Sequence, residues 1–284
     1  MLKKDVFSQA THAWIPGIAV RYRLFWEITK RSLQRYMAYR AAAVAGLATN
    51  FFFGLLRMAI LLALYGERQE VLGYTVQGII TYAALTQAVI GYLNLFMWSD
   101  LANSVHNGEV AVDLLKPMNY FSLWLAQDLG RAAVNLLLRG VTIMFIYALV
   151  VDLTYPHGLA QWGALALAIV LSWLISFGFR FLINLSAFWT PNARGIIRSA
   201  FVFSWFASGL LMPLRFFPDW VNFVIYLTPF PYMLNAVVEI YVGVAQGAEV
   251  IEILLIQLGW AVALIVAGQL LLRAGVRRLV ILGG

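Results

Sequence analysis

The 284-residue sequence contains no cysteine and few charged residues, and both scarcities restrict the kind of protein it can be. Without cysteine the chain has no disulfide framework, no thiolate nucleophile and no cysteine-ligated metal. Charged residues make up 12%, whereas an ordinary soluble domain contains about 25%. Since 62% of the residues are hydrophobic, much of the folded surface must face lipid.

Catalytic groups are also scarce where a membrane enzyme would need them. The three histidines, His12, His106 and His157, lie outside the long apolar stretches, and those stretches contain no acidic pair. This pattern disfavours intramembrane hydrolases, metalloenzymes and histidine-dependent acyltransferases. The dipeptide Gly-Lys does not occur, so the chain contains no phosphate-binding loop of the Gly-x-x-x-x-Gly-Lys type.

Six long apolar stretches predict a polytopic membrane protein. A hydrocarbon core about 30 Å thick requires roughly 20 apolar residues of helix to cross it. We therefore predict an all-α integral membrane fold with six transmembrane helices. The expected transmembrane domain covers 41–272, with spans at about 41–65, 74–98, 123–151, 159–189, 197–212 and 250–272.

Lysine and arginine outside these spans fall almost entirely on one side. They lie in residues 1–40, in the loops after spans two and four, and in the tail 273–284. Only Arg68 and Arg215 lie on the other side. By the positive-inside rule, both termini are expected in the cytoplasm. We interpret the net charge of +7 as a determinant of topology and expect no nucleic-acid partner.

The arm 1–40 predicts an amphipathic helix before the first span. Apolar and aromatic residues recur there at steps of three or four, with arginine and lysine on the flanks. We expect this helix to lie in the plane of the cytoplasmic headgroups, and the alternative is a solvated basic arm. The residues of the predicted face are Ile18, Tyr22, Phe25, Thr29, Leu33 and Tyr36.

The loop 99–117, between spans two and three, is too long and polar to be a simple turn. Asn107-Gly108 predicts a helix stop, because glycine readily adopts the left-handed conformation. A second short segment follows and ends at Lys116-Pro117. Its valines and leucines beside charged residues predict contact with a protein partner, or alternatively with the membrane surface. The candidate contact residues are Glu109, Val110, Val112, Asp113, Leu114, Leu115 and Lys116.

Span five is short and is followed by an aromatic run, 212–231, that contains four prolines. Prolines remove backbone donors and obstruct the preceding turn, so we predict a broken, re-entrant segment in the outer leaflet. A helix over about 231–244 is then expected on the outer surface. The residues predicted to form an outer gate are Met212, Pro213, Phe217, Pro218 and Trp220.

Ionisable residues inside spans are costly and must face protein or water. Asp128 and Arg131, three residues apart, are predicted to pair on one helical face. A substrate path is the other possibility for such residues, and its candidates are Asn50, Phe53, Arg57 and Arg139. For Arg57, a fixed contact between helices and a place in the path both stay open. An arginine-lined path in a channel or secondary transporter is an alternative function.

Three features together resemble the membrane subunits of the ABC type-2 transporter superfamily, in the bacterial branch of daunorubicin-type exporters. The first is the amphipathic helix before span one. The second is the motif Asn107-Gly-Glu-Val-Ala-Val-Asp-Leu-Leu-Lys-Pro117. The third is Ser208-Gly-Leu-Leu-Met-Pro213, followed by Phe217-Pro-Asp-Trp220 and Thr228-Pro229.

The resemblance implies the permease subunit of an ATP-driven exporter of amphipathic or hydrophobic substrates in the bacterial cytoplasmic membrane. It also implies two separate ATPase subunits, which hold ATP and Mg, and a second permease, identical or similar. The loop 103–117 would then be the coupling helix that docks on an ATPase. Besides these proteins, only membrane lipids are expected as partners. For this chain itself we expect no enzymatic activity, catalytic residue, cofactor or metal.

Overall fold

The computed structural model describes residues 17–38, 40–96, 98–190 and 192–278. The expected arm before residue 17 and the end of the tail after residue 278 lie outside these described residues. Within them the chain is almost entirely helical, which confirms the all-α membrane fold. The exception is a short antiparallel hairpin, β1 (Glu70–Val71) and β2 (Tyr74–Thr75).

Five helical stretches in the described part of the chain are long and apolar enough to cross a membrane. One of them is continuous through three elements, because a π-helical stretch, η1, joins α7 to α8 without a break. The five stretches are α3 (Arg40–Tyr65), α4 (Val76–Leu93), α7 (Tyr120–Val134) with η1 (Asn135–Val141) and α8 (Thr142–Ala148), α9 (Leu159–Leu185) and α13 (Ala248–Val276). A short 3-10 turn, η2 (Ser186–Phe188), follows α9.

The fifth expected span, 197–212, is the helix α10 (Ala193–Ala207). Its 15 residues reach about 22 Å at 1.5 Å per residue, which is less than a hydrocarbon core of about 30 Å. The helix ends there because Gly209 adopts a left-handed conformation (φ +79°) and Pro213 follows. The described residues therefore form five long helices and one short helix, and the short helix lies where the sequence predicted the short fifth span.

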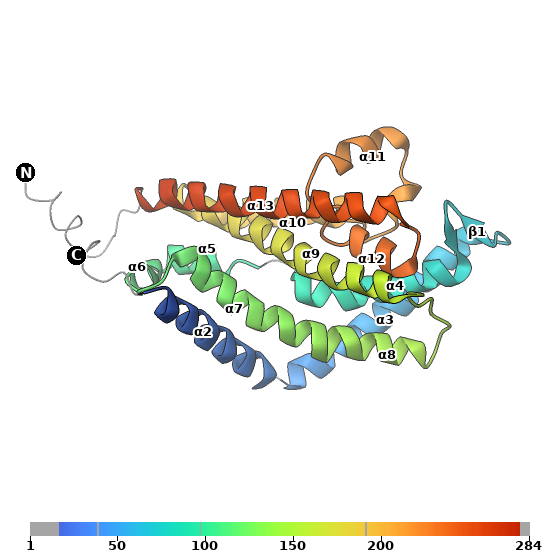
Figure 1. Cartoon of the computed structure of the whole chain (residues 1–284), viewed down its shortest axis with the longest axis horizontal. Helices are drawn as coiled ribbons and strands as arrows, with labels where there is room; N and C mark the ends of the chain where they lie inside the picture. Colours follow the sequence, from blue (N-terminus) through green and yellow to red (C-terminus); the bar gives the residue numbers. More distant parts are fainter. Residues whose placement is uncertain (1–16, 39, 97, 191, 279–284) are drawn as a thin grey trace, which may run out of the picture.

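Burial differs strongly among the spans and identifies the centre of the bundle. In α4, 78% of the membrane-spanning residues are buried, whereas in α3 and α13 only 17% are buried. The helices run side by side, with α2 (Ile18–Ala38) lying obliquely along α7 (Figure 1). Helix α9 packs against α13, and α3 packs against α4. Helices α3 and α13 therefore present most of their apolar side chains to lipid.

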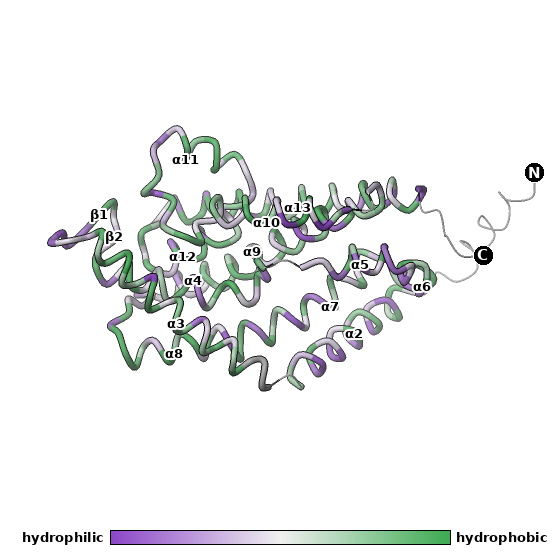
Figure 2. Tube along the Cα trace, turned by 180° about the vertical axis from the view of Figure 1, so that it is seen from behind, coloured by the Kyte–Doolittle hydropathy of each residue, from purple (hydrophilic) through white to green (hydrophobic). Residues whose placement is uncertain are grey.

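The two ends of the bundle carry different elements (Figure 1). At one end lie the start of α2, the short helices α5 (Asp100–His106) and α6 (Val110–Leu114), and the last turns of α13. At the other end lie the hairpin and α11 (Asp219–Tyr226). Figure 2 shows hydrophilic residues in the loop that leads into β1 and a mixture of hydrophilic and hydrophobic residues along α2.

Helix α2 uses part of its predicted apolar face for contact with α7 rather than with lipid. Thr29 and Ser32 are buried in this contact, and the Ser32 hydroxyl donates to the carbonyl oxygen of Gln127 at 2.5 Å. The helices approach closely at Gly130, where an added Cβ would lie 2.5 Å from the carbonyl oxygen of Thr29. Ile18 and Tyr22, at the start of the predicted face, stay exposed.

The segment after α10 also departs from expectation. It runs through a 3-10 turn, η3 (Leu214–Phe216), and α11 to the helix α12 (Asn235–Val242). We expected a surface helix over 231–244, but Asn235–Tyr241 are all buried, and α12 packs against α9 and α4. The expectation was wrong because aromatic and apolar residues suit the membrane interface and a protein core equally well.

Candidate functional site

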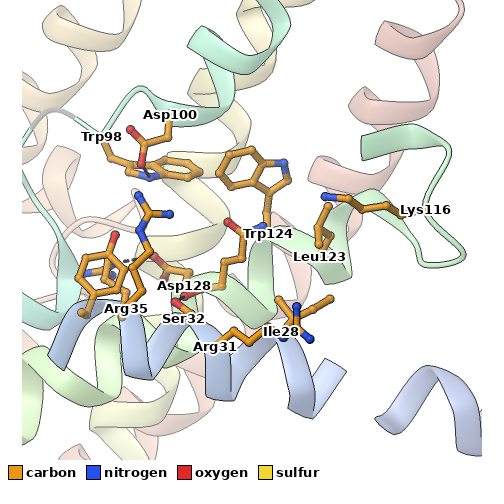
Figure 3. A pocket seen from close by; sticks show the side chains of 13 residues that line it. Ile28, Arg31, Ser32, Arg35, Trp98, Asp100, Lys116, Leu123, Trp124 and Asp128 are labelled. Atoms are coloured by element: carbon orange, nitrogen blue, oxygen red, sulfur yellow. Dashed lines mark hydrogen bonds and ion pairs between the residues drawn. The ribbon is translucent and has the colours of Figure 1, made fainter. Parts of the chain in front are cut away.

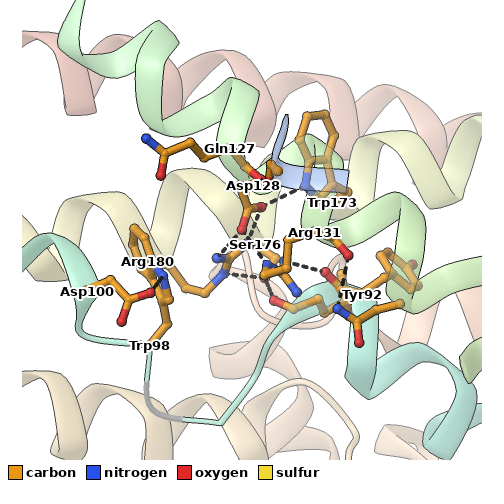
Figure 4. A network of polar contacts seen from close by, with 12 residues as sticks. Tyr92, Trp98, Asp100, Gln127, Asp128, Arg131, Trp173, Ser176 and Arg180 are labelled. Atoms are coloured by element: carbon orange, nitrogen blue, oxygen red, sulfur yellow. Dashed lines mark hydrogen bonds and ion pairs between the residues drawn. The ribbon is translucent and has the colours of Figure 1, made fainter. Parts of the chain in front are cut away.

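A cluster of three charged side chains lies buried between α7 and α9 (Figure 4). Asp128 accepts a hydrogen bond from Arg131 Nε at 2.8 Å and two from the Arg180 guanidinium at 2.9 and 2.8 Å. The Trp173 indole donates a fourth bond at 2.9 Å. The predicted pair of Asp128 and Arg131 is confirmed, and Arg180 is its third member. We call these three residues the buried charge cluster.

The cluster also caps the end of α4. Arg131 donates to the carbonyl oxygens of Gly91 at 3.0 Å and Tyr92 at 2.8 Å, and Ser176 donates to that of Leu93 at 2.6 Å. The last carbonyls of a helix have no partner within the helix itself. Helix α4 ends here because Asn94 takes the left-handed conformation, with φ +55°. Span two is thus shorter than the predicted 74–98.

The chain between α4 and α5 is held from α9 as well. The Asn184 side chain donates to the carbonyl oxygen of Trp98 at 3.0 Å and accepts from the amide of Ala102 at 3.1 Å. The Arg180 guanidinium lies 5.3 Å from the centre of the Trp98 ring, within range of a cation–π interaction. The linker before α5 therefore contacts Arg180, which shares Asp128 with the Arg131 that caps α4.

Helices α5 and α6 form the predicted pair of short helices, which we call the α5–α6 segment (residues 100–116). Gly108 has φ +77°, which confirms the predicted helix stop. Val110 is buried within the fold and Leu114 is half-buried, so neither offers a free apolar surface. Val112 and Leu115 are 64% and 85% exposed, respectively.

The charged members of the α5–α6 segment lie on its surface. Glu109 is exposed, and Lys116 donates to Asp113 at 2.6 Å in an ion pair between residues three apart. An exposed pair of this kind contributes only about 0 to 1 kcal/mol to stability. The segment thus presents two apolar side chains, Val112 and Leu115, beside groups of both charges.

The expected substrate-path residues do not converge. The Arg57 guanidinium donates to Thr86 Oγ1 at 3.0 Å and to the carbonyl oxygen of Leu210 at 2.5 Å. Asn50 lies 3.4 Å from the carbonyl oxygen of Gln87 on α4, whereas Phe53 is exposed on the outside of α3. Arg57 thus joins α3 to α4 and to the chain just after α10, which is the fixed contact between helices that the sequence left open.

Arg139 lies apart from these residues, on the π-helical stretch η1. Its guanidinium donates to Asn135 Oδ1 at 3.2 Å and packs against Gly46 of α3. The Nε atom of Arg139 is buried and has no hydrogen-bond partner among the described residues. Arg139 thus forms a contact between two helices, η1 and α3.

The predicted outer-gate residues occupy several environments at the other end of the bundle. Pro213 is buried, Met212 is half-buried against the core, and Phe217 is half-buried. Pro218 and Trp220 are exposed at the start of α11, which projects from the bundle in Figure 1. The segment is broken as expected, and these five side chains differ in their exposure.

An ion-pair network holds the segment after α10 to the helices α12 and α13. Arg215 donates to Glu239 on α12 at 2.8 Å and to Glu249 on α13 at 2.5 Å. Burial alone would lower the pKa of Arg215, but the hydrogen bond and charge of Glu239 and the charge of Glu249 outweigh it and raise this pKa. Tyr74 donates to Glu239 from β2 at 3.4 Å. Three elements of this end therefore meet at one buried carboxylate.

Residues 51–283 match the model of a family described as ABC-2 family transporter protein. The chain belongs to the ABC-2 transporter family. This ABC-2 permease is thus a multi-pass membrane subunit of an ABC transporter, as the resemblance implied. Searches of curated proteins and of solved structures found no match.

Sequence analysis did not predict the ion-pair partners of two residues of the permease, Arg180 and Glu239. An arginine in an apolar span must face protein, so Arg180 carried a signal of burial but none of its partner, which lies 52 residues earlier. Glu239 carried no such signal, because it lies in the helix 231–244 that was expected on the outer surface. Among the described residues of the permease, no group of three or more histidine or acidic side chains could hold a metal ion.

Proposed function

We propose that this permease is the membrane subunit of an ATP-driven exporter, and that a separate ATPase binds its α5–α6 segment. The exposure of Val112 and Leu115 on a short helix at the basic end of the bundle is the observation that carries this proposal. An apolar side chain at 85% exposure gains most from a protein partner. The chain itself has no phosphate-binding loop, so the ATP and Mg belong to the partner.

Hydrophobic contact should contribute more to this docking than charge. Burying a leucine side chain fully stabilises a complex by about 1.5–3 kcal/mol, whereas an exposed ion pair contributes about 0 to 1 kcal/mol. We therefore assign the main docking role to Leu115 and Val112, with Glu109 and Lys116 at the rim. Val110 and Leu114 support the segment from within the permease.

Transport requires that ATPase binding differ in free energy between two arrangements of the spans. The contacts of the linker before α5 support such a connection. Asn184 and Arg180 on α9 hold this linker, and Arg131 on α7 holds the end of α4. We propose that displacement of the α5–α6 segment by the ATPase reaches α4, α7 and α9 through these contacts.

The remaining parts of the proposal concern orientation and assembly. The basic residues of α2, Lys116, Arg194 and the end of α13 gather at the end that carries the α5–α6 segment, which supports a cytoplasmic location for both termini. We propose a bacterial inner-membrane complex of two permeases, identical or similar, with two ATPases. Its cargo would be amphipathic or hydrophobic and would leave the cytoplasm or the inner leaflet.

The experiment compares Leu115→Asp with Leu159→Asp, a matched change at an exposed leucine at the start of α9. Each tagged permease is purified with its co-expressed ATPase and reconstituted in vesicles. We expect Leu115→Asp to weaken ATPase retention at least about tenfold, since losing about 1.5 kcal/mol corresponds to that factor, and to abolish ATP-driven transport. Leu159→Asp should change neither.

Two results would overturn the proposal. The first is equal ATPase retention and transport by both variants and the wild type. The second is substrate flux that an ion gradient drives without nucleotide, which would favour the channel or secondary transporter. The contacts of Arg57 do not favour that alternative, because its guanidinium group is engaged by Thr86 and Leu210.

A further inference from the structure

A cleft of about 410 Å³ opens between α2, the first turns of α7 and the linker before α5 (Figure 3). This volume falls in the range of about 300–1,000 Å³ that is typical of small-molecule sites. Its walls come from segments far apart in the sequence, with Arg31 and Arg35 on α2, Trp124 on α7 and Lys116 just after α6. Neither the buried charge cluster nor the proposed docking surface explains why these cationic side chains gather around it.

The rim of the cleft is basic. Arg31 and Arg35 lie one turn apart on α2, both exposed, and no described carboxylate forms an ion pair with either. Lys116, which also pairs with Asp113, lies on the opposite side (Figure 3). Asp100 is the one acidic residue among the described rim residues, since Asp128 is buried with its arginines. Guanidinium groups in this arrangement can hold a phosphate through two parallel hydrogen bonds.

The walls below the rim are apolar and aromatic. Trp98 and Trp124 meet edge to face with ring centres 5.5 Å apart, and Leu123 and Ile28 complete the lining. Burial raises the pKa of Tyr36 at the same cleft, so its hydroxyl stays neutral and can donate a hydrogen bond. A ligand for this cleft therefore needs an anionic group and an attached apolar part.

The depth of the cleft matches the headgroup region of a membrane. The continuous span Tyr120–Ala148 has 29 residues and is about 44 Å long, which exceeds a hydrocarbon core of about 30 Å. Because Arg31, Arg35 and Lys116 surround the first turns of α7, we place the surplus length at this end, which puts Leu123 and Trp124 at the level of the headgroups. Tryptophan is enriched at this level, where one part of the ring is apolar and the other wet.

We propose that this cleft binds the phosphate of an anionic membrane phospholipid, with Arg31, Arg35 and Lys116 as its ligands. The acyl chains would leave along the lipid-facing side of α2 and α7. Because Lys116 and Asp100 belong to the α5–α6 segment, the lipid would contact α2 and this segment together. The inference holds whichever side of the membrane this end of the permease faces, so it is independent of the proposed ATPase docking.

The test measures phospholipid binding to the purified permease by native mass spectrometry. Phosphatidylglycerol, phosphatidylcholine and inorganic phosphate are titrated separately. The variant Arg31→Gln/Arg35→Gln is compared with Arg21→Gln/Arg23→Gln, a change of the same charge at exposed positions of α2 outside the cleft. Lys116→Gln examines the opposite wall. Thermal unfolding of each variant checks that the fold is retained.

We expect phosphatidylglycerol to bind at least about tenfold more weakly to Arg31→Gln/Arg35→Gln than to the control pair, which is the effect of losing one hydrogen bond to a charged group. Lys116→Gln should also weaken binding. An equal effect of both arginine pairs would show only general attraction to the membrane and overturn the proposal. Inorganic phosphate that binds as tightly as the lipid would assign the cleft to a free anion instead.

Discussion

Replacing Asp128 by asparagine removes one negative charge from the buried charge cluster and changes almost nothing in shape. The carboxylate accepts four hydrogen bonds, from Arg131, Arg180 and Trp173, and its side chain is only 3% exposed. In Asp128→Asn the new amide group would point a donor at arginine donors. Both guanidinium groups would then stay buried without a counter-charge.

The expected magnitude follows from this geometry. Breaking a buried ion pair by removing one partner costs about 3–5 kcal/mol, because the remaining charge stays out of water. Arg131 retains its bonds to the carbonyl oxygens of α4, so the larger share of the cost should come from Arg180, whose side chain is fully buried. The double variant Asp128→Leu/Arg180→Met should therefore be more stable than Asp128→Asn.

Unfolding of the purified permease by titration with SDS measures these free energies. The control is Asp152→Asn, an identical change at an exposed position, which should shift stability by no more than about 0.5 kcal/mol. Hydrogen exchange over residues 88–96 provides a local measurement, since loss of the cluster should loosen the end of α4. If Asp128→Asn unfolds with the same free energy as Asp152→Asn, the cluster does not hold the helices as described.

Three further predictions concern other contacts between helices. Gly130→Ala places a methyl group against the backbone of α2, so we expect faster proteolysis of α2, whereas Gly163→Ala, in open space, should have no effect. Arg57→Gln removes the donors to the chain after α10, and we expect faster hydrogen exchange over 207–214 and a loss of about 1.5–3 kcal/mol in unfolding free energy. Arg215→Gln leaves Glu239 buried without its ion pair, which should lower the unfolding free energy by about 2 kcal/mol after allowance for the partial exposure of Arg215, whereas Glu249→Gln should lower it by about 0 to 1 kcal/mol.

The existence of the spans could be predicted from the sequence, because apolar length is a property of each segment alone. Their ends could not. Helix α4 was expected to continue to residue 98, because Leu95 and Trp98 extend the apolar run. Both are buried in non-helical chain, where Trp205 donates to the carbonyl oxygen of Leu95 at 2.7 Å. Asn94 is a local signal for this stop, because asparagine can adopt the left-handed conformation, but the contacts from other helices leave no mark in the sequence.

The contacts of the charged residues were likewise predictable only in part. Asp128 and Arg131 could be paired in advance, because a spacing of three places them on one face of a helix. The partner of Arg57 is a carbonyl 153 residues away, and backbone carbonyls leave no mark in a sequence. The exposed apolar residues of α6 were also only partly predictable. Gly108 and Pro117 marked the limits of the short segment, but only the fold decides that Val110 faces inward and Val112 outward.

The buried charge cluster contains more arginine than aspartate, and the end of α4 explains this excess. Two arginines against one aspartate leave one positive charge in excess, which would be costly in a membrane interior. The carboxyl end of a helix carries about half a negative charge, and carbonyls left unpaired in lipid cost several kcal/mol each. Arg131 supplies donors and charge to that end of α4. Arg131 and the carbonyl oxygens of α4 thus satisfy each other. If the end of α4 separated from α7 and α9, both the guanidinium group and these carbonyls would lose their partners. In the proposed mechanism, a displacement of the α5–α6 segment would therefore move these helices together, and α2, packed at Gly130, would follow α7.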